Sequence, residues 1–343
     1  MMSPKKVTVL KEINKSIDTV LQKIDKENEK FLSVYNLNVK QKKIMLKAMD
    51  EFEKNIQAFF IGQKKGYLEI IKKVPEEIKG RKIKKRIRKA NIPEDMLDNI
   101  TDIIAEFIFA NEKQHIDRLE ALYTTFANSF FSEIAEICAR AVEGNKFSPD
   151  TRLSETADKW LKNHTIKFAQ EVNQTTHDAV IKVIRDSLKS GNGNTSAANE
   201  MVSTLPSFFN QNKIKAKSNK LSDIVNVDIY NQIYQSLEKQ KCFEFYRARR
   251  ITRTETNSSL NASTLEGWRQ SEVIDKKEWL CAFNNSRDAH MSANGQQVGL
   301  DEPFIVNGEK LMHPGDSSCG ASAENVIQCK CTMKSVLRYK RNT

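Results

Sequence analysis

The chain has 343 residues, of which 39% are hydrophobic and 29% are charged, and its formal net charge is +11. A chain of this length can bury a sizeable core in two or three domains, and only 12 glycines and 7 prolines argue against an all-β or a disordered protein. The excess of basic residues favours an acidic partner, such as nucleic acid, an anionic membrane or an acidic protein surface.

The N-terminal residues contain no apolar segment of the kind found in signal peptides. The most apolar stretch, residues 103–110, is too short to cross a bilayer and carries Glu106. We therefore expect no membrane partner and a protein that is made and kept in a reducing cytoplasm. There, cysteines are more often core, metal-binding or catalytic residues than members of disulfides.

The N-terminal part combines charged helices with a basic segment. Residues 5–73 predict one or two polar helices. Residues 79–89 hold eight Lys or Arg, and the spacing of Ile83 and Ile87 favours a short basic amphipathic helix. Two interpretations fit this segment. It is either a solvated basic face, or a site that neutralises nucleic-acid phosphates through Lys82, Lys84, Lys85, Arg86, Arg88 and Lys89.

The middle of the chain predicts further helices. Apolar residues recur at steps of three and four from Leu119 to Ala141, and Cys138 lies on this stripe as a small buried hydrophobe. Ser148 followed by Pro149 is typical of a helix start, which places a boundary there.

The next helical segment, residues 150–190, precedes Gly191–Ser196, which we interpret as a tight connection between helices. His164 and His177 have no partner at metal-ligand spacing and are interpreted as ordinary surface or boundary histidines.

The pattern changes after a helix predicted at residues 245–271. Residues 276–283 and 303–308 resemble strands, and Asn- and Gly-containing pairs or triplets mark turns at 284–285, 294–295, 307–308 and 313–315. The predicted fold class is mainly α with a small C-terminal α+β unit. The predicted domains are residues 1–93, 94–149, 150–271 and 272–336, followed by a basic tail at 337–343.

The C-terminal unit gathers residue types that bind metals: Cys281, His290, His313, Cys319, Cys329 and Cys331. Zinc takes four nitrogen, sulfur or oxygen ligands, and a small unit with little core gains stability from a bound metal. The C-x-C pair is poorly placed to close on itself as a disulfide. Its spacing is not the usual C-x₂-C of zinc sites either, so a metal site stays open at this point. A disulfide from Cys319 to Cys329 or Cys331 is disfavoured in a cytoplasm.

Two further groups of polar residues allow alternatives. Arg253 and Glu255 form either part of a solvated helix face with weak ion pairs, or a buried pair that fixes the helix against the C-terminal unit. Asp288 and His290 are candidates for acid–base or metal chemistry. The sequence lacks a cluster of carboxylates, a serine elbow, a P-loop and an H-E-x-x-H motif, so no enzymatic activity is predicted.

The order of these features resembles the phage head-morphogenesis family, the minor head proteins typified by the F protein of bacteriophage Mu. The resemblance covers about residues 155–335. It is carried by Arg253, Thr254 and Glu255 on one helix, a strand marked by Trp279, the segment from Arg287 to His290, a Pro-Gly-Asp turn that ends at Asp316, and Gln328-Cys329-Lys330-Cys331, where the family usually has Asn-Cys-Arg-Cys.

The resemblance implies a structural protein of the virion head, assembled in the host cytoplasm and acting near the portal in head morphogenesis and in DNA packaging or ejection. The implied partners are the portal protein, a major capsid or scaffolding protein, and packaged double-stranded DNA.

Some members of the family carry Cys at the position of His290, which favours a structural Zn²⁺. Its implied ligands are His290, Cys329 and Cys331, with Cys281 or His313 as the fourth, whereas Cys319 is a bystander. Two alternatives stay open: a metal-dependent nuclease or toxin-like enzyme that uses Asp288 and His290, and a free DNA-binding protein that acts through residues 79–89.

Overall fold

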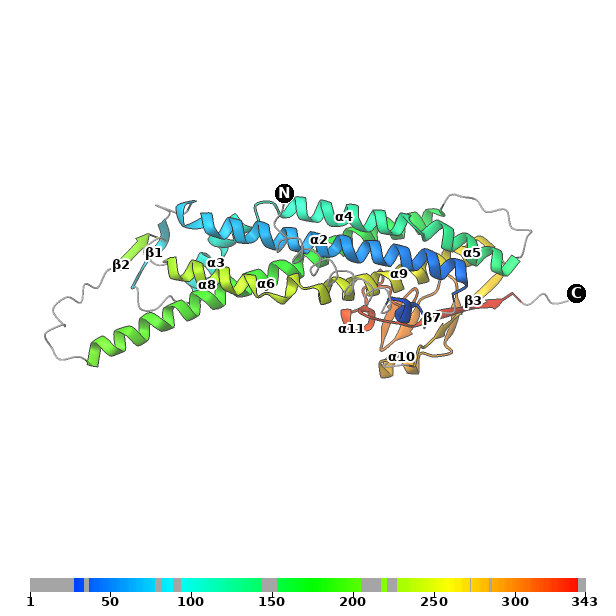
Figure 1. Cartoon of the computed structure of the whole chain (residues 1–343). Helices are drawn as coiled ribbons and strands as arrows, with labels where there is room; N and C mark the ends of the chain where they lie inside the picture. The colour runs from blue at the N-terminus through cyan, green and yellow to red at the C-terminus, as the bar shows by residue number, and fades with distance from the viewer. Residues whose placement is uncertain are drawn as a thin grey trace, which may run out of the picture. The chain divides into compact units, whose positions relative to one another are not determined.

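The computed structural model describes residues 28–33, 37–77, 82–88, 94–143, 153–204, 217–220, 227–271, 273–283 and 286–338. Within these residues the protein is mainly helical, and most of its strands lie after residue 273 (Figure 1). This confirms the predicted fold class. Among the described helices, none combines the length and the apolarity needed to cross a bilayer.

The long helices follow one another in chain order: α2 (Val39–Glu77), α3 (Glu94–Ile108), α4 (Glu112–Asn128), α5 (Phe131–Glu143), α6 (Glu155–Thr204), α8 (Val227–Glu238) and α9 (Phe245–Ser271). A short 3₁₀ helix, η3 (Lys241–Phe243), precedes α9. The predicted helix at 245–271 is therefore confirmed at both ends.

The helices belong to two compact units, each assembled from segments that are far apart in sequence. The first unit comprises the described residues of 1–56, 120–168 and 248–343, and the second those of 57–119 and 169–247. The division into five consecutive segments stays a prediction.

Aromatic side chains fill the core of the first unit. Phe52 of α2 stacks on Phe126 of α4 with ring centroids 4.2 Å apart, and Tyr123 packs against Phe168 of α6 at 5.0 Å. The predicted apolar stripe spans two helices, because the chain turns at residues 129–130 between α4 and α5. Its residue Cys138 is buried, as predicted.

A side-chain cap sets the start of α6. The Ser154 hydroxyl accepts a hydrogen bond from the Ala157 backbone N–H at 3.1 Å, which satisfies one of the free N–H groups at the helix start. The buried Glu266 carboxylate of α9 accepts hydrogen bonds from both the N–H and the hydroxyl of Ser154. The start predicted at Ser148 and Pro149 lies outside the described residues.

The second unit is held in part by one buried arginine. The Arg247 guanidinium donates hydrogen bonds of 2.8 Å to the Thr176 hydroxyl and to the carbonyls of Val172 and Cys242. It also lies 4.6 Å from the ring centroid of Phe60. The three hydrogen bonds balance the cost of burying this charge.

Two predictions about this unit are wrong. The basic segment forms a strand, β1 (Lys82–Arg88), which pairs antiparallel with β2 (Lys217–Lys220), and not a helix. Residues four apart share a face in strands as well as in helices, so the spacing of Ile83 and Ile87 does not separate the two.

Residues 191–196 continue α6 and do not connect two helices. The stretch contains glycines and good cap residues but no proline, and helices tolerate glycine at a cost of about 1 kcal/mol each.

The C-terminal part consists of short strands and turns. Strand β3 (Ile274–Leu280) lies between β4 (Gln297–Gly299) and β7 (Thr332–Leu337) in an antiparallel sheet, and β5 (Phe304–Val306) and β6 (Glu309–Leu311) form a hairpin. Asn307 and Gly308 join the hairpin strands with positive φ angles of 52° and 77°, which suits a tight hairpin turn. The turns predicted at 294–295, 307–308 and 313–315 are confirmed.

Two short helices complete this part: α10 (Asp288–Ser292) and α11 (Ala323–Val326). We call residues 273–338 the tail. It lies alongside α9, with which it shares the first unit (Figure 1).

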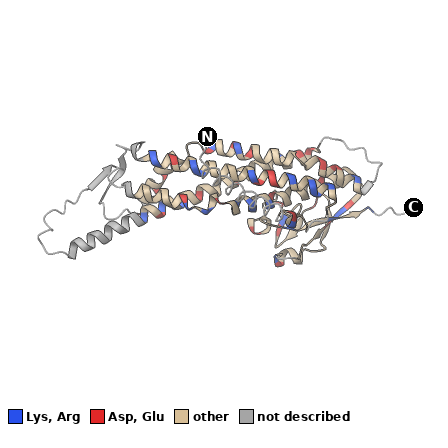
Figure 2. Ribbon diagram, viewed as in Figure 1, with Lys and Arg blue, Asp and Glu red and all other residues tan. Residues whose placement is uncertain are grey.

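Acidic and basic residues are interspersed along the described helices (Figure 2). The residues that we predict to contact nucleic acid are not among these described side chains. The side chains of Lys82, Lys84, Lys85, Arg86 and Arg88 are not described, and Lys89 lies outside the described residues.

Candidate metal centre and the polar network beside it

Helix α9 buries a polar face. From Thr252 onward its buried polar residues are small side chains plus one carboxylate: Thr252, Thr254, Thr256, Asn257, Ser258, Ser259, Asn261, Ser263, Glu266 and Ser271. Buried polar groups need hydrogen-bond partners. Thr254, Asn261 and Ser263 donate to carbonyls of α9 itself, and the hydroxyls of Thr252, Thr256 and Ser258 have no hydrogen-bond partner among the described residues. The interpretation of this helix as a solvated polar face is therefore wrong.

Further partners come from the backbone of the tail. The Gln328 N–H donates to the Thr254 hydroxyl at 3.0 Å. The Asn261 side-chain amide donates to the carbonyls of Pro314 and Cys331, each at 3.1 Å. The segments that carry the Pro-Gly-Asp turn and the C-x-C pair are thus both attached to one helix.

Glu255 has a different partner from the one predicted. Its carboxylate lies 2.7 Å from Nε2 of His164 on α6, and the His164 ring stacks on Trp160 with centroids 4.6 Å apart. Arg253 lies over the ring of Phe31. His164 is buried, so its interpretation as an ordinary surface or boundary histidine is wrong. A lone histidine carries no sequence signal for a partner on another helix.

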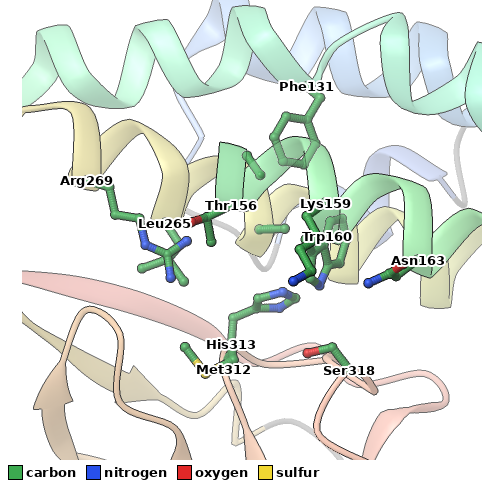
Figure 3. A pocket seen from close by; sticks show the side chains of 12 residues that line it. Phe131, Thr156, Lys159, Trp160, Asn163, Leu265, Arg269, Met312, His313 and Ser318 are labelled. Carbon is green, nitrogen blue, oxygen red and sulfur yellow. The ribbon is translucent and has the colours of Figure 1, made fainter. Parts of the chain in front are cut away.

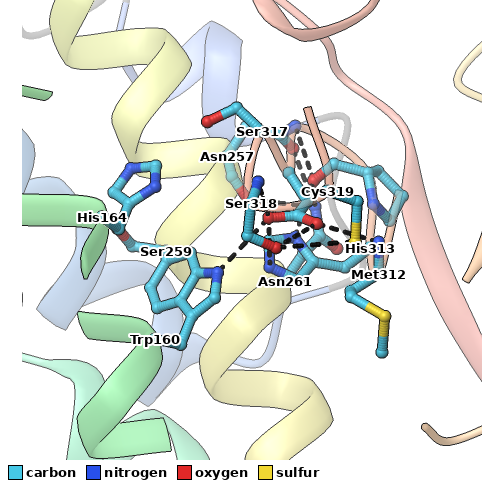
Figure 4. A network of polar contacts seen from close by, with 12 residues as sticks. Trp160, His164, Asn257, Ser259, Asn261, Met312, His313, Ser317, Ser318 and Cys319 are labelled. Atoms are coloured by element: carbon cyan, nitrogen blue, oxygen red, sulfur yellow. Dashed lines mark hydrogen bonds and ion pairs between the residues drawn. The ribbon is translucent and has the colours of Figure 1, made fainter. Parts of the chain in front are cut away.

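A polar network links Trp160 of α6 to Met312 and Ser318 of the tail (Figure 4), and Asp316 is the acceptor that they share. Its fully buried carboxylate accepts hydrogen bonds from the N–H groups of Met312 and Ser318, from the Ser318 hydroxyl, and from the Trp160 indole at 3.3 Å. Burial alone would raise the pKa of this carboxyl, but His313 and the backbone donors outweigh burial and lower it.

The strand residue Trp279 is fully buried and packs edge-on against Phe304 and His290. The neighbouring Lys277 is also fully buried, and its ammonium donates to the carbonyls of Leu300 and Met312 at 2.7 and 2.8 Å. Burial lowers the pKa of Lys277 to about 7. The sequence pattern gave no sign of this lysine, because strand lysines normally face solvent.

The structure brings His290, Cys329 and Cys331 together. Their ligand atoms all lie within 4.8 Å of one another, and all three residues are buried. Nδ1 of His290 is 3.6 Å from the sulfur of Cys329 and 3.5 Å from that of Cys331. Zinc–sulfur and zinc–nitrogen bonds of ordinary length at a tetrahedral angle place such atoms about 3.6 Å apart. The three residues could therefore hold a metal ion.

Local structure explains how these ligands converge. Arg287 precedes α10 and donates to the carbonyl of Ile327, which ties the segment of His290 to that of the cysteines. Gln328 adopts a positive φ of 55°, a conformation in which Asn is enriched. This accounts for the Asn that the resembled family usually has at the position of Gln328.

The two thiols of the cluster differ in acidity. A hydrogen bond from Cys331 lowers the pKa of Cys329, and the Arg287 charge acts in the same direction. The same pairing, together with burial, raises the pKa of Cys331. Metals bind the thiolate form of cysteine, and the lowered pKa of Cys329 favours that form.

Neither predicted fourth ligand belongs to the cluster within the described residues. His313 lies in the Asp316 network, and burial lowers its pKa to about 4. Cys281 is buried, and its sulfur accepts a hydrogen bond from the Phe283 N–H at 3.4 Å. The register that pairs Leu280 with Thr332 would, one residue further, place Cys281 opposite Cys331. Cys319 is exposed and outside the cluster.

Asp288 and His290 do not face a common site. The Asp288 side chain is exposed, whereas His290 is buried with Nδ1 directed at the two cysteines. Two groups that share a proton or a substrate must reach the same point in space. This arrangement gives no geometric support to the predicted alternative of an enzyme.

Comparison with known proteins yields similarity to an uncharacterized protein over most of the chain and to an enzyme over a short part of it. The uncharacterized protein YqbB of Bacillus subtilis (strain 168) is 22% identical over 330 residues, which cover 95% of this chain and 90% of YqbB. The NAD(+)–arginine ADP-ribosyltransferase EFV of Enterococcus faecalis is 27% identical over 107 residues, or 30% of this chain and 21% of that protein. No family model and no solved structure matches the chain.

Proposed function

We propose that the chain is a minor head protein of a tailed phage or prophage, which acts in head morphogenesis near the portal. One observation carries the proposal. The motifs of the resemblance are spread over residues 253–331, yet they converge around α9 and the tail. Thr254 bonds Gln328, Asp316 organises the turn, and Trp279 packs on His290. Motifs that converge on a buried module are those expected of a structural part.

We further propose that the cluster binds a structural Zn²⁺ through His290, Cys329 and Cys331, with Cys281 as the fourth ligand. Catalytic zinc needs a position open to water or substrate, whereas structural zinc is enclosed by protein ligands. Each of the three clustered residues is only 1% exposed. Bound there, zinc would cross-link α10 to the segment that precedes β7.

Metal analysis of the purified protein tests this site. We expect about one zinc per chain, lost in Cys331→Ser and retained in the matched control Cys319→Ser, whose cysteine is exposed in the same tail. Loss of zinc in Cys281→Ser but not in His313→Asn would identify the fourth ligand. Equal zinc content in Cys331→Ser and Cys319→Ser would refute the site.

The place of the protein in the virion is tested in a phage or prophage that carries its gene. We expect mass spectrometry to detect the chain in purified heads, and deletion of the gene to reduce the yield of infectious particles. Complementation with Cys319→Ser should restore the yield, whereas Cys331→Ser should not. Absence of the chain from purified heads would rule out the proposed function.

The similarity to an ADP-ribosyltransferase favours one rival, an enzyme. The similarity covers 21% of that protein, so no activity is carried over from it. Purified protein should neither release nicotinamide from NAD⁺ nor cleave DNA with Mg²⁺. Cleavage that disappears in Asp288→Asn, or steady nicotinamide release, would favour the enzyme instead.

A further inference from the structure

The first unit contains a pocket of about 220 Å³ that is separate from the metal cluster. Helices α5, α6 and α9 and the loop at residues 312–318 line it (Figure 3). Most of its wall is apolar, and the side chains responsible are Phe131, Ala157, Trp160, Ala262, Leu265 and Met312. A pocket with such walls and a few polar groups is typical of small-ligand sites.

One buried polar atom of the pocket has no hydrogen-bond partner. The His313 side chain is 2% exposed, and its ring lies below Trp160 in the pocket wall (Figure 3). Nδ1 lies 3.2 Å from the Pro314 carbonyl, which can only accept, so Nδ1 carries the proton. Nε2 then offers a lone pair and lacks a hydrogen-bond partner, since Oδ1 of Asp316, 3.9 Å away, is beyond hydrogen-bond reach. A buried acceptor of this kind is costly unless a donor reaches it.

The polar groups at the rim add positive charge. The exposed Lys159 and the partly buried Arg269 line the pocket together with the exposed Ser318. Arg269 also pairs with Asp301 at 2.8 Å. An apolar pocket with cationic residues at its rim favours a ligand that has an apolar body and an anionic end.

We propose that this pocket binds a small hydroxyaryl carboxylate. Its ring would lie among the apolar side chains beside Trp160, its hydroxyl would donate to Nε2 of His313, and its carboxylate would approach Lys159 and Arg269. Two sources carry this chemistry: a free aromatic acid, and the C-terminal tyrosine of another protein chain.

Calorimetric titration tests the pocket with 4-hydroxyphenylacetate and N-acetylglycyltyrosine as probes. We expect saturable binding at millimolar or lower concentration, and tighter binding of one probe identifies the source. The analogue 4-methoxyphenylacetate keeps the ring and the carboxylate but has no donor. It should bind at least about fivefold more weakly, because Nε2 of His313 would stay without a donor.

Two variants locate the binding. Lys159→Gln should weaken it about threefold. The matched control Lys162→Gln, whose lysine is exposed on α6 and pairs with Asp158, should not change it. Ala262→Leu should abolish binding by filling the pocket, and its melting temperature checks that it is folded. No saturable binding up to about 10 mM, or equal binding by the wild type and both Lys159→Gln and folded Ala262→Leu, would overturn the proposal.

Discussion

Replacing Gly267 with alanine should destabilise the first unit, although the same change stabilises most helices. Gly267 lies in α9, where a Cβ atom would stand 2.2 Å from the Ala135 carbonyl oxygen of α5 and 2.9 Å from Cβ of Cys138. The nearer atom belongs to the backbone of a helix and cannot rotate away. Glycine therefore allows α5 and α9 to approach this closely.

The expected magnitude follows from two opposing terms. Alanine gains about 1 kcal/mol over glycine within a helix. A contact of 2.2 Å is about 1 Å shorter than an ordinary carbon–oxygen contact, so the helices must separate along a packed interface. Overpacking of this kind costs roughly 1–3 kcal/mol, and more when backbone must move. We expect a net loss of about 2 kcal/mol in the free energy of unfolding.

Tryptophan fluorescence during urea unfolding measures this loss. The chain has three tryptophans, Trp160, Trp268 and Trp279, and all of them lie in the first unit. Gly66→Ala in α2 is a control for the substitution itself, because a Cβ atom there meets nothing within 4 Å. Gly66 lies in the second unit, so circular dichroism follows its unfolding, and that variant should leave the midpoint unchanged or raise it. If Gly267→Ala also left the midpoint unchanged, the close contact between α5 and α9 would be refuted.

Three further predictions concern charge. Because the pKa of His313 is lowered to about 4 from 6.5, the unfolded chain binds a proton that the folded chain does not in this window. The wild type should then lose about 3 kcal/mol of stability as the pH falls from above the unfolded pKa to below the folded pKa of His313. An equal loss in His313→Asn would contradict this assignment to His313. Lys277 has a pKa lowered to about 7 from 10.5, so wild-type stability should rise by about 2 kcal/mol relative to Lys277→Met between pH 7 and 9, measured by urea unfolding. If the basic segment binds DNA, neutralising Lys84, Lys85 and Arg86 together should reduce the salt slope of binding by about 3, and an unchanged slope would exclude direct phosphate contacts.

The sequence predicts the features that depend on local rules or on residue chemistry. The helix at 245–271 was predicted, and the stretches 276–283 and 303–308 were predicted as strands from β-formers between turn residues, whereas β4, β6 and β7 were not predicted. The convergence of His290 with Cys329 and Cys331 was predicted from residue type and from the resemblance. Cys281 was proposed for the same chemistry, and the strand register makes it a better candidate than His313.

Features that depend on partners distant in sequence were missed or left open. The sequence left open whether the polar face of α9 is solvated or covered by the tail, because small polar residues are typical of a solvated surface and nothing local identifies the covering segment. His164 was interpreted as isolated, since its partner Glu255 lies on another helix. Lys277 was missed for the same reason, because the carbonyls of Leu300 and Met312 that accept its hydrogen bonds come from later turns.

The polar attachment of the tail favours one geometry more than it adds stability. Each hydrogen bond from α9 replaces one with water, so its net contribution is only about 1 kcal/mol, whereas an unmatched buried group costs more. A shifted tail would take the Gln328 N–H away from the Thr254 hydroxyl and the Cys331 carbonyl away from the Asn261 amide. Gly315 further restricts how the tail can lie against α9. Its φ is 80°, and a Cβ atom there would meet the Asn257 amide at 2.8 Å. A helix that accepts the tail in a single register suits the proposed role in head assembly, which needs a fixed surface, since apolar packing alone would let the tail slide along the helix.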